Sequence, residues 1–141
     1  MKWFLTLLML VSTTTFAHDD ATLDKMKTPN GGQLRMAGAY HIELVVVKDS
    51  PQSKENPLVI YLTDHGDGKI SSAGMKASVT LFAGGTKATA ELKPDGDNRL
   101  KGVARYASAP DMKAVVSLTA ADGKTVQARF TPLEKAAEHA D

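Results

Sequence analysis

Short runs of alternating apolar and polar residues, each ended by a turn signal, fill most of this chain. The longest run, residues 38–47, is dense in β-branched and aromatic side chains and alternates with a period of two, which is typical of a β-strand. Similar runs predict the remaining strands. In full, strands are expected at residues 33–37, 40–47, 58–63, 77–83, 86–92, 99–106, 112–119 and 125–131.

Turn sequences rich in Gly, Pro, Asp and Asn separate these runs about every ten residues. The pattern predicts an all-β protein, an immunoglobulin-like antiparallel β-sandwich of seven to nine short strands, with a small β-barrel as the alternative. Residues 48–57 form the longest polar loop, and Pro51, Asn56 and Pro57 should keep it from pairing regularly.

The two ends of the chain do not follow the strand pattern. Lys2, an apolar run of about ten residues and a small-residue stretch ending at Ala17 are typical of a secretory signal peptide at residues 1–17. The apolar run is shorter than the roughly 20 residues needed to span a bilayer. Residues 18–28 are then expected to form a flexible arm or a single helical turn, 29–133 the β-sandwich domain and 134–141 a polar tail.

Charge and cysteine content narrow the class of protein. The expected signal contains one of the 17 Lys and Arg residues and none of the 16 Asp and Glu residues, so the mature chain has 16 of each. A neutral chain lacks the electrostatic footprint of a nucleic-acid or anionic-membrane binder. Without cysteine, the domain depends on its core alone and has no thiolate ligand or nucleophile. A short signal and a disulfide-free product fit the bacterial periplasm.

Histidines and carboxylates supply the candidate chemistry. On the strand 40–47, His41 and Glu43 share one face, about 6–7 Å apart, while Ile42 and Leu44 share the other. This spacing suits a shared metal ion and suits an ordinary solvent-facing polar pair equally well. Cleavage after Ala17 would make His18 the first residue, whose α-amino group and imidazole can chelate one ion together.

A metal site is therefore the leading hypothesis, with His18 and His41 as ligands and Glu43, Asp64 or His65 completing the set. Copper is expected first and zinc second, because amine and imidazole nitrogens suit Cu(II) and affinity peaks at copper. The methionines Met26, Met36, Met75 and Met112 are interpreted as core or surface residues, since their spacing places no two together.

No enzyme signature is present: the chain lacks a G-x-S-x-G elbow, a phosphate loop and an H-E-x-x-H motif, so no catalytic activity is predicted. The alternative class is a non-enzymatic interaction module that docks on a cell-envelope complex. Such a module should expose a contiguous apolar patch larger than a few hundred Å².

Two stretches carry a resemblance to a known family. Residues 29–34 and 38–44 combine a Gly-Gly turn with a Gly-x-aromatic-x-x-Glu strand, and residues 92–102 form a Pro- and Gly-marked hairpin. Together they resemble small periplasmic β-sandwich proteins, and the N-terminal domains of adaptor subunits, of heavy-metal efflux systems of the resistance-nodulation-division class. The resemblance implies a role in metal homeostasis beside a periplasmic efflux component. A looser similarity, carried by His18 alone, is to periplasmic copper carriers whose mature chain begins with His.

Overall fold

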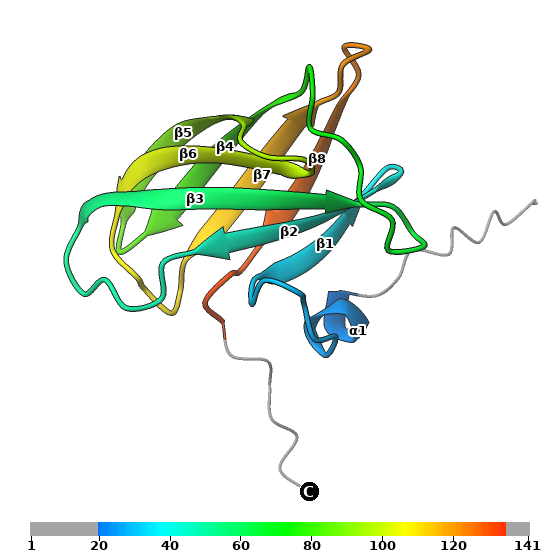
Figure 1. Cartoon of the computed structure of the whole chain (residues 1–141). Helices are drawn as coiled ribbons and strands as arrows, with labels where there is room; N and C mark the ends of the chain where they lie inside the picture. Colours follow the sequence, from blue (N-terminus) through cyan, green and yellow to red (C-terminus); the bar gives the residue numbers. More distant parts are fainter. Residues whose placement is uncertain (1–19, 135–141) are drawn as a thin grey trace, which may run out of the picture.

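Eight antiparallel strands and one short helix make up the computed structural model, which describes residues 20–134 (Figure 1). The elements are α1 (Asp20–Asp24), β1 (Gln33–Ala37), β2 (Tyr40–Val46), β3 (Lys54–Thr63), β4 (Lys76–Ala83), β5 (Thr86–Pro94), β6 (Arg99–Tyr106), β7 (Lys113–Thr119) and β8 (Thr125–Phe130). The predicted all-β class is confirmed, with a strand count inside the expected range.

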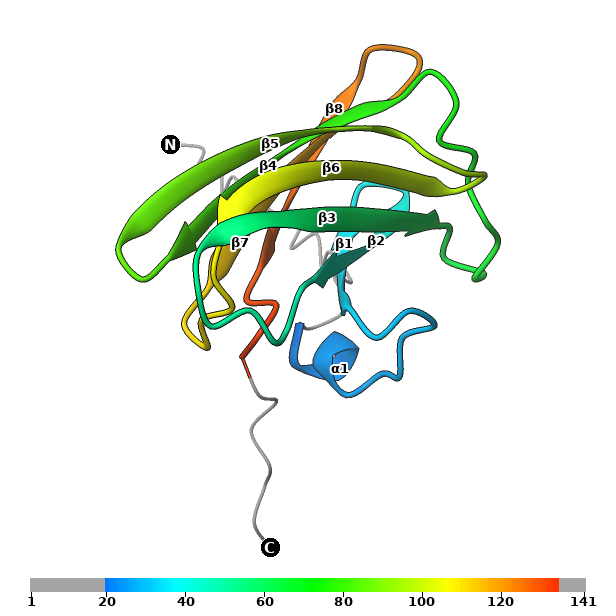
Figure 2. The same cartoon turned by 60° about the vertical axis from the view of Figure 1, so that its left-hand side comes forward.

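The strands follow the order β1-β2-β3-β6-β5-β4-β7-β8 in a sheet that is nearly closed into a barrel (Figures 1 and 2). The two halves, β1-β2-β3-β6 and β5-β4-β7-β8, join where β5 pairs with β6 at only two positions, Lys93 with Lys101 and Pro94 with Leu100. At this seam Gly102 is required, because a Cβ there would collide with the Glu91 carbonyl oxygen. The form is consistent with both the predicted sandwich and the alternative barrel.

Alternate residues of every strand point into the enclosed core. On β2 the inward residues are Ile42, Leu44 and Val46, and the inward residues of the other strands are similarly buried. The largest fully buried side chains are Phe130, Ile42, Leu44, Leu58, Ile60, Leu62, Leu81, Leu92, Leu100, Met112, Leu118 and Val79. Both halves of the sheet contribute to this set, so a single core supports the whole molecule.

The start of β3 differs from the expectation for residues 48–57. Lys54 to Pro57 pair with Tyr106 to Val103 of β6, so the strand begins four residues earlier than predicted. Proline is tolerated at position 57 because the pairing of β3 with β2 ends at Leu58. No residue of β2 therefore needs the N–H that Pro57 lacks. Beyond this pair the Tyr106 hydroxyl links the two chain segments. It accepts from the Val47 N–H at 3.0 Å and donates to the Pro57 carbonyl at 2.6 Å.

The rest of the predicted polar loop is fixed by a buried hydrogen-bond network. Asn56 donates to the Ser50 hydroxyl at 3.0 Å and to the Tyr106 carbonyl at 2.8 Å. The Ser108 hydroxyl accepts from the Ser50 N–H and donates to the Val47 carbonyl. Asn56 and Ser50 are both buried, and these hydrogen bonds satisfy their polar groups. The network therefore holds the loop against the end of the barrel.

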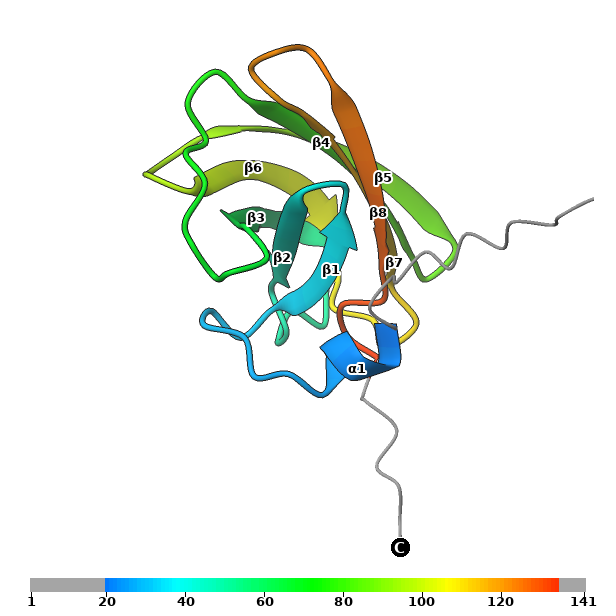
Figure 3. The same ribbon diagram turned by 90° about the vertical axis from the view of Figure 1, so that its right-hand side faces the viewer.

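The segment before β1 forms the helical turn that the sequence allowed, in place of a fully flexible arm. α1 lies beside β1 (Figures 2 and 3). Leu23 of α1 is buried, and Asp24 pairs with the inward-facing Arg35 of β1 at 2.7 Å. The Gln33 side chain spans the neighbouring edge, accepting from the Thr131 N–H at 2.7 Å and donating to the Thr131 hydroxyl at 3.2 Å. These contacts bring the two edge strands β1 and β8 together. The expected signal peptide lies outside the described residues, as does the tail beyond residue 134.

Candidate metal centre

The outer face of β2 carries two buried polar side chains. His41 is 7% exposed and Glu43 3% exposed, and both lie on the face opposite Ile42 and Leu44, as the alternation predicted. They do not face solvent, however. Each is covered by a different turn, and the two turns give them different roles.

His65 covers His41. It lies in the turn after β3, two residues beyond Thr63, which is the residue that pairs with His41 across β2 and β3. The Asp64 carboxylate stabilises this turn, since its Oδ1 accepts from the N–H groups of Gly66 and Gly68 at 2.8 Å each. The closed turn directs His65 back over the outer face of the sheet.

The two imidazoles meet at their nitrogen atoms. His41 Nε2 and His65 Nδ1 are 2.9 Å apart, and the rings stand nearly perpendicular, with an interplanar angle of 85° and centroids 4.7 Å apart. Two nitrogen ligands about 2.0–2.1 Å from one tetrahedral ion are separated by about 3.3 Å. A shared proton therefore fits this separation as it stands, whereas a shared metal ion requires the two nitrogens to move apart by about 0.4 Å. His41 is buried and His65 is exposed, so an ion has access from the His65 side.

Glu43 is fully engaged elsewhere. One carboxylate oxygen accepts from the Asn30 and Gly32 N–H groups, at 3.1 and 2.8 Å, and the other accepts from the Asn30 side-chain amide at 3.1 Å. Gly32 is needed at this point because a Cβ would collide with the Leu44 carbonyl oxygen. Glu43 therefore anchors the turn before β1 to the sheet, and the structure does not bring it to the histidine pair.

The five predicted ligands thus separate into three groups. His41 and His65 are in contact, whereas Glu43 and Asp64 each bind backbone amides of a turn. His18 lies outside the described residues. Between residues 20 and 134, no three His, Cys, Asp or Glu side chains form a metal-binding group.

One neighbour of the pair was overlooked by the sequence interpretation. Met36 of β1 is directly opposite His41 in the β1–β2 hairpin, on the same outer face, and is partly exposed. The interpretation of the methionines considered only their distances from one another. The register was nevertheless readable, because a two-residue Gly38-Ala39 turn pairs Ala37 with Tyr40 and therefore Met36 with His41.

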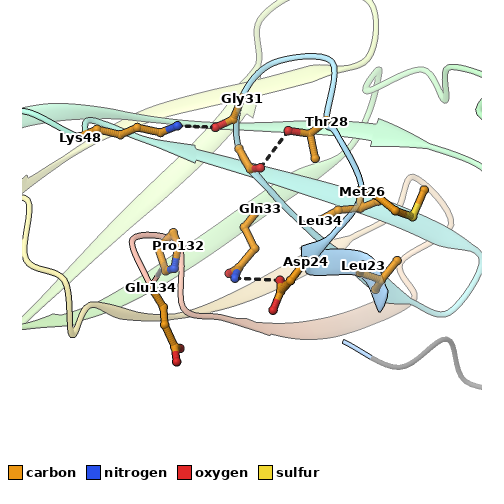
Figure 4. A pocket seen from close by; sticks show the side chains of 11 residues that line it. Leu23, Asp24, Met26, Thr28, Gly31, Gln33, Leu34, Lys48, Pro132 and Glu134 are labelled. Carbon is orange, nitrogen blue, oxygen red and sulfur yellow. Dashed lines mark hydrogen bonds between the residues drawn. The ribbon is translucent and has the colours of Figure 1, made fainter. Parts of the chain in front are cut away.

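A separate pocket of about 160 Å³ lies between α1, the turn before β1 and the segment after β8 (Figure 4). Its polar groups bind one another: Gln33 donates to Asp24 at 3.2 Å, and Lys48 donates to the Gly31 carbonyl at 2.7 Å. The pocket borders the first half of β1, away from the hairpin turn where the histidines meet. The first of these bonds attaches α1 to β1, and the second attaches the turn before β1 to the segment after β2.

Comparison of the chain with protein-family models, with curated proteins and with solved structures finds no match in any of the three. Within residues 20–134, no helix has the length and apolarity needed to cross a bilayer. In the same region the exposed large apolar side chains are Met26, Phe82 and Val103, which lie after α1, on β4 and on β6. They lie on three different segments of the chain.

Proposed function

We propose that this chain binds a transition-metal ion, copper first and zinc second, through the imidazoles of His41 and His65. The supporting observation is the 2.9 Å separation of His41 Nε2, on β2, and His65 Nδ1, in the turn after β3. Imidazole is a favoured ligand of copper and zinc, and two such nitrogens already converge before any ion binds. Little side-chain ordering then opposes binding.

The compartment and role follow from the sequence features. A signal peptide at residues 1–17 would export the chain to the periplasm, where the resemblance to efflux-associated proteins suggests a carrier or accessory in metal homeostasis. If cleavage leaves His18 first, its amine–imidazole chelate supplies a further site or further ligands.

The test is titration of the mature protein, beginning at His18, with Cu(II), Cu(I) and Zn(II) in competition with a chelator. His65→Ala should lower the affinity for copper by at least about tenfold, because one of two converging ligands is lost. His65 is exposed, so the fold should survive the change, and circular dichroism checks this. Binding should weaken in acid, because imidazole binds metal only in its unprotonated form.

Two controls separate the sources of binding. His139→Ala removes a histidine from the C-terminal end of the chain and should leave the affinity unchanged. One extra residue before His18 blocks the amine–imidazole chelate alone, so binding lost only in that sample would assign the ion to the N-terminus. Equal affinity in the wild type and in His65→Ala would remove the imidazole pair from the proposal.

A further inference from the structure

Met36 is the residue nearest in register to His41 from the β1 side. Ala37 and Tyr40 close the two-residue hairpin, and pairs in an antiparallel ladder alternate, so Met36 and His41 form a non-hydrogen-bonded pair. In such a pair the two Cα atoms are only about 4.5 Å apart, and the side chains stand side by side. His41, Met36 and the overlying His65 thus share one small area of the outer face.

The side chain of Met36 has the reach and the chemistry to contact an ion held there. Methionine is unbranched, with three rotatable bonds, so its sulfur can adjust to a ligand beside it. Met36 is partly exposed and does not belong to the buried core, whereas Met112, for example, is fully buried. No core packing is given up if its sulfur turns toward the imidazoles.

We infer that Met36 supplies a thioether ligand beside His41 and His65, so that the site selects Cu(I) and other soft monovalent ions over Zn(II). The inference rests on the proposed function, since it names the ion that the imidazole pair would take. Thioether sulfur favours Cu(I), whereas zinc sites in proteins are built from three or four nitrogen, thiolate or carboxylate ligands. Two imidazoles and one thioether match the first ion better than the second.

The experiment uses Ag(I), a soft monovalent ion that undergoes no redox change during titration, together with Cu(I) under anaerobic conditions and Zn(II). Met36→Leu keeps the side-chain volume and removes the sulfur. It should lower the affinity for Ag(I) and Cu(I) about tenfold or more and change the affinity for Zn(II) less than about threefold. Met26→Leu is the matched control, because Met26 is an exposed methionine before the Gly31–Gly32 turn.

A second measurement needs no variant. In wild-type protein labelled at the methionine methyl groups, Ag(I) should shift the Met36 methyl resonance and leave that of the buried Met112 in place. The proposal that Met36 is a ligand is wrong if Met36→Leu binds Ag(I) with unchanged affinity and Ag(I) does not shift the Met36 methyl resonance of the wild type. If His65→Ala still abolishes binding in that case, the proposed imidazole site survives. If wild-type protein binds none of the ions, both proposals fail.

Discussion

At the scale of single residues, neighbouring buried polar groups on β2 differ because their partners differ. Glu43 accepts three hydrogen bonds from N–H donors of one turn, so its charge is compensated by fixed dipoles. His41 instead meets the ring of His65, a partner that can exchange a proton for a metal ion. The same alternation places both side chains on the outer face of β2, and the turns that cover them make one an anchor and the other a candidate ligand.

Tyr106 is expected to contribute to the stability of the fold through its hydroxyl group. Its hydroxyl connects the Val47 N–H to the Pro57 carbonyl just beyond Val46 and Leu58, where the pairing of β2 with β3 ends. Tyr106→Phe leaves both backbone groups without this bridge and should lower the free energy of unfolding by about 1–3 kcal/mol. Urea denaturation measures the change. Tyr61→Phe on β3, where the ring is only partly buried, is the control and should have a smaller effect.

The same residue makes stability depend on alkaline pH. Burial raises the pKa of Tyr106, and the hydrogen bond from Val47 opposes this only in part. The folded state therefore holds the phenolic proton more tightly than the unfolded chain, whose tyrosine pKa is about 10. The resulting stabilisation is present below about pH 10 and is lost as the pH rises through the folded-state value. In Tyr106→Phe that part of the alkaline loss should disappear.

At the scale of elements, the turn after β3 positions His65. The Asp64 carboxylate closes it and lies close to Gly68, where a Cβ would come within 2.7 Å of Asp64 Oδ2. Asp64→Ala should leave the barrel folded, with a loss of less than about 1 kcal/mol, because the bonds are exposed. It should lower copper affinity about tenfold, since His65 must then be ordered on binding.

The hairpin between β7 and β8 offers a matched control for that change. Asp122 accepts from the Lys124 N–H at 3.0 Å in a turn far along the chain, so Asp122→Ala removes a similar exposed bond without touching the histidines. Hydrogen exchange should quicken at Gly66 and Gly68 in the first variant only. Copper affinity that falls equally in both variants would show that the turn does not preorganise His65.

Strand positions could be predicted because each depends on local signals, and the exceptions had non-local causes. Alternation and turn residues located all eight strands to within a few residues. The start of β3 was missed because the partners of Pro57 are distant in sequence: it pairs with Val103 and accepts from Tyr106, 49 residues away. His41 and His65 were both named as candidates, but their meeting depends on the fold of the Asp64 turn. Met36 was within reach of the sequence, since hairpin register alone pairs it with His41.

At the scale of the whole molecule, two seams decide how nearly the sheet closes. Between β5 and β6 only two residue pairs join the halves, and Gly102 allows the close approach to Glu91. Between β1 and β8, side-chain hydrogen bonds take the place of a backbone hydrogen-bond ladder. They join Gln33 to Thr131, which are 98 residues apart in the sequence. A separation of this size cannot be read from local patterns, which is why sandwich and barrel could not be distinguished beforehand.

Gln33 is therefore expected to control the β1–β8 seam. Gln33→Ala leaves the Thr131 N–H without its carbonyl acceptor and should lower the free energy of unfolding by about 1–2 kcal/mol. The β1–β2 hairpin, which carries Met36 and His41, is then less firmly attached to β8. Amide exchange should become faster in β1 and β8, with a smaller change in β4. Gln127→Ala on β8, which removes an exposed bond to Ser117 at 3.4 Å, should leave both measurements unchanged. Exchange that quickens uniformly across all strands would mean that the seam opens only with global unfolding.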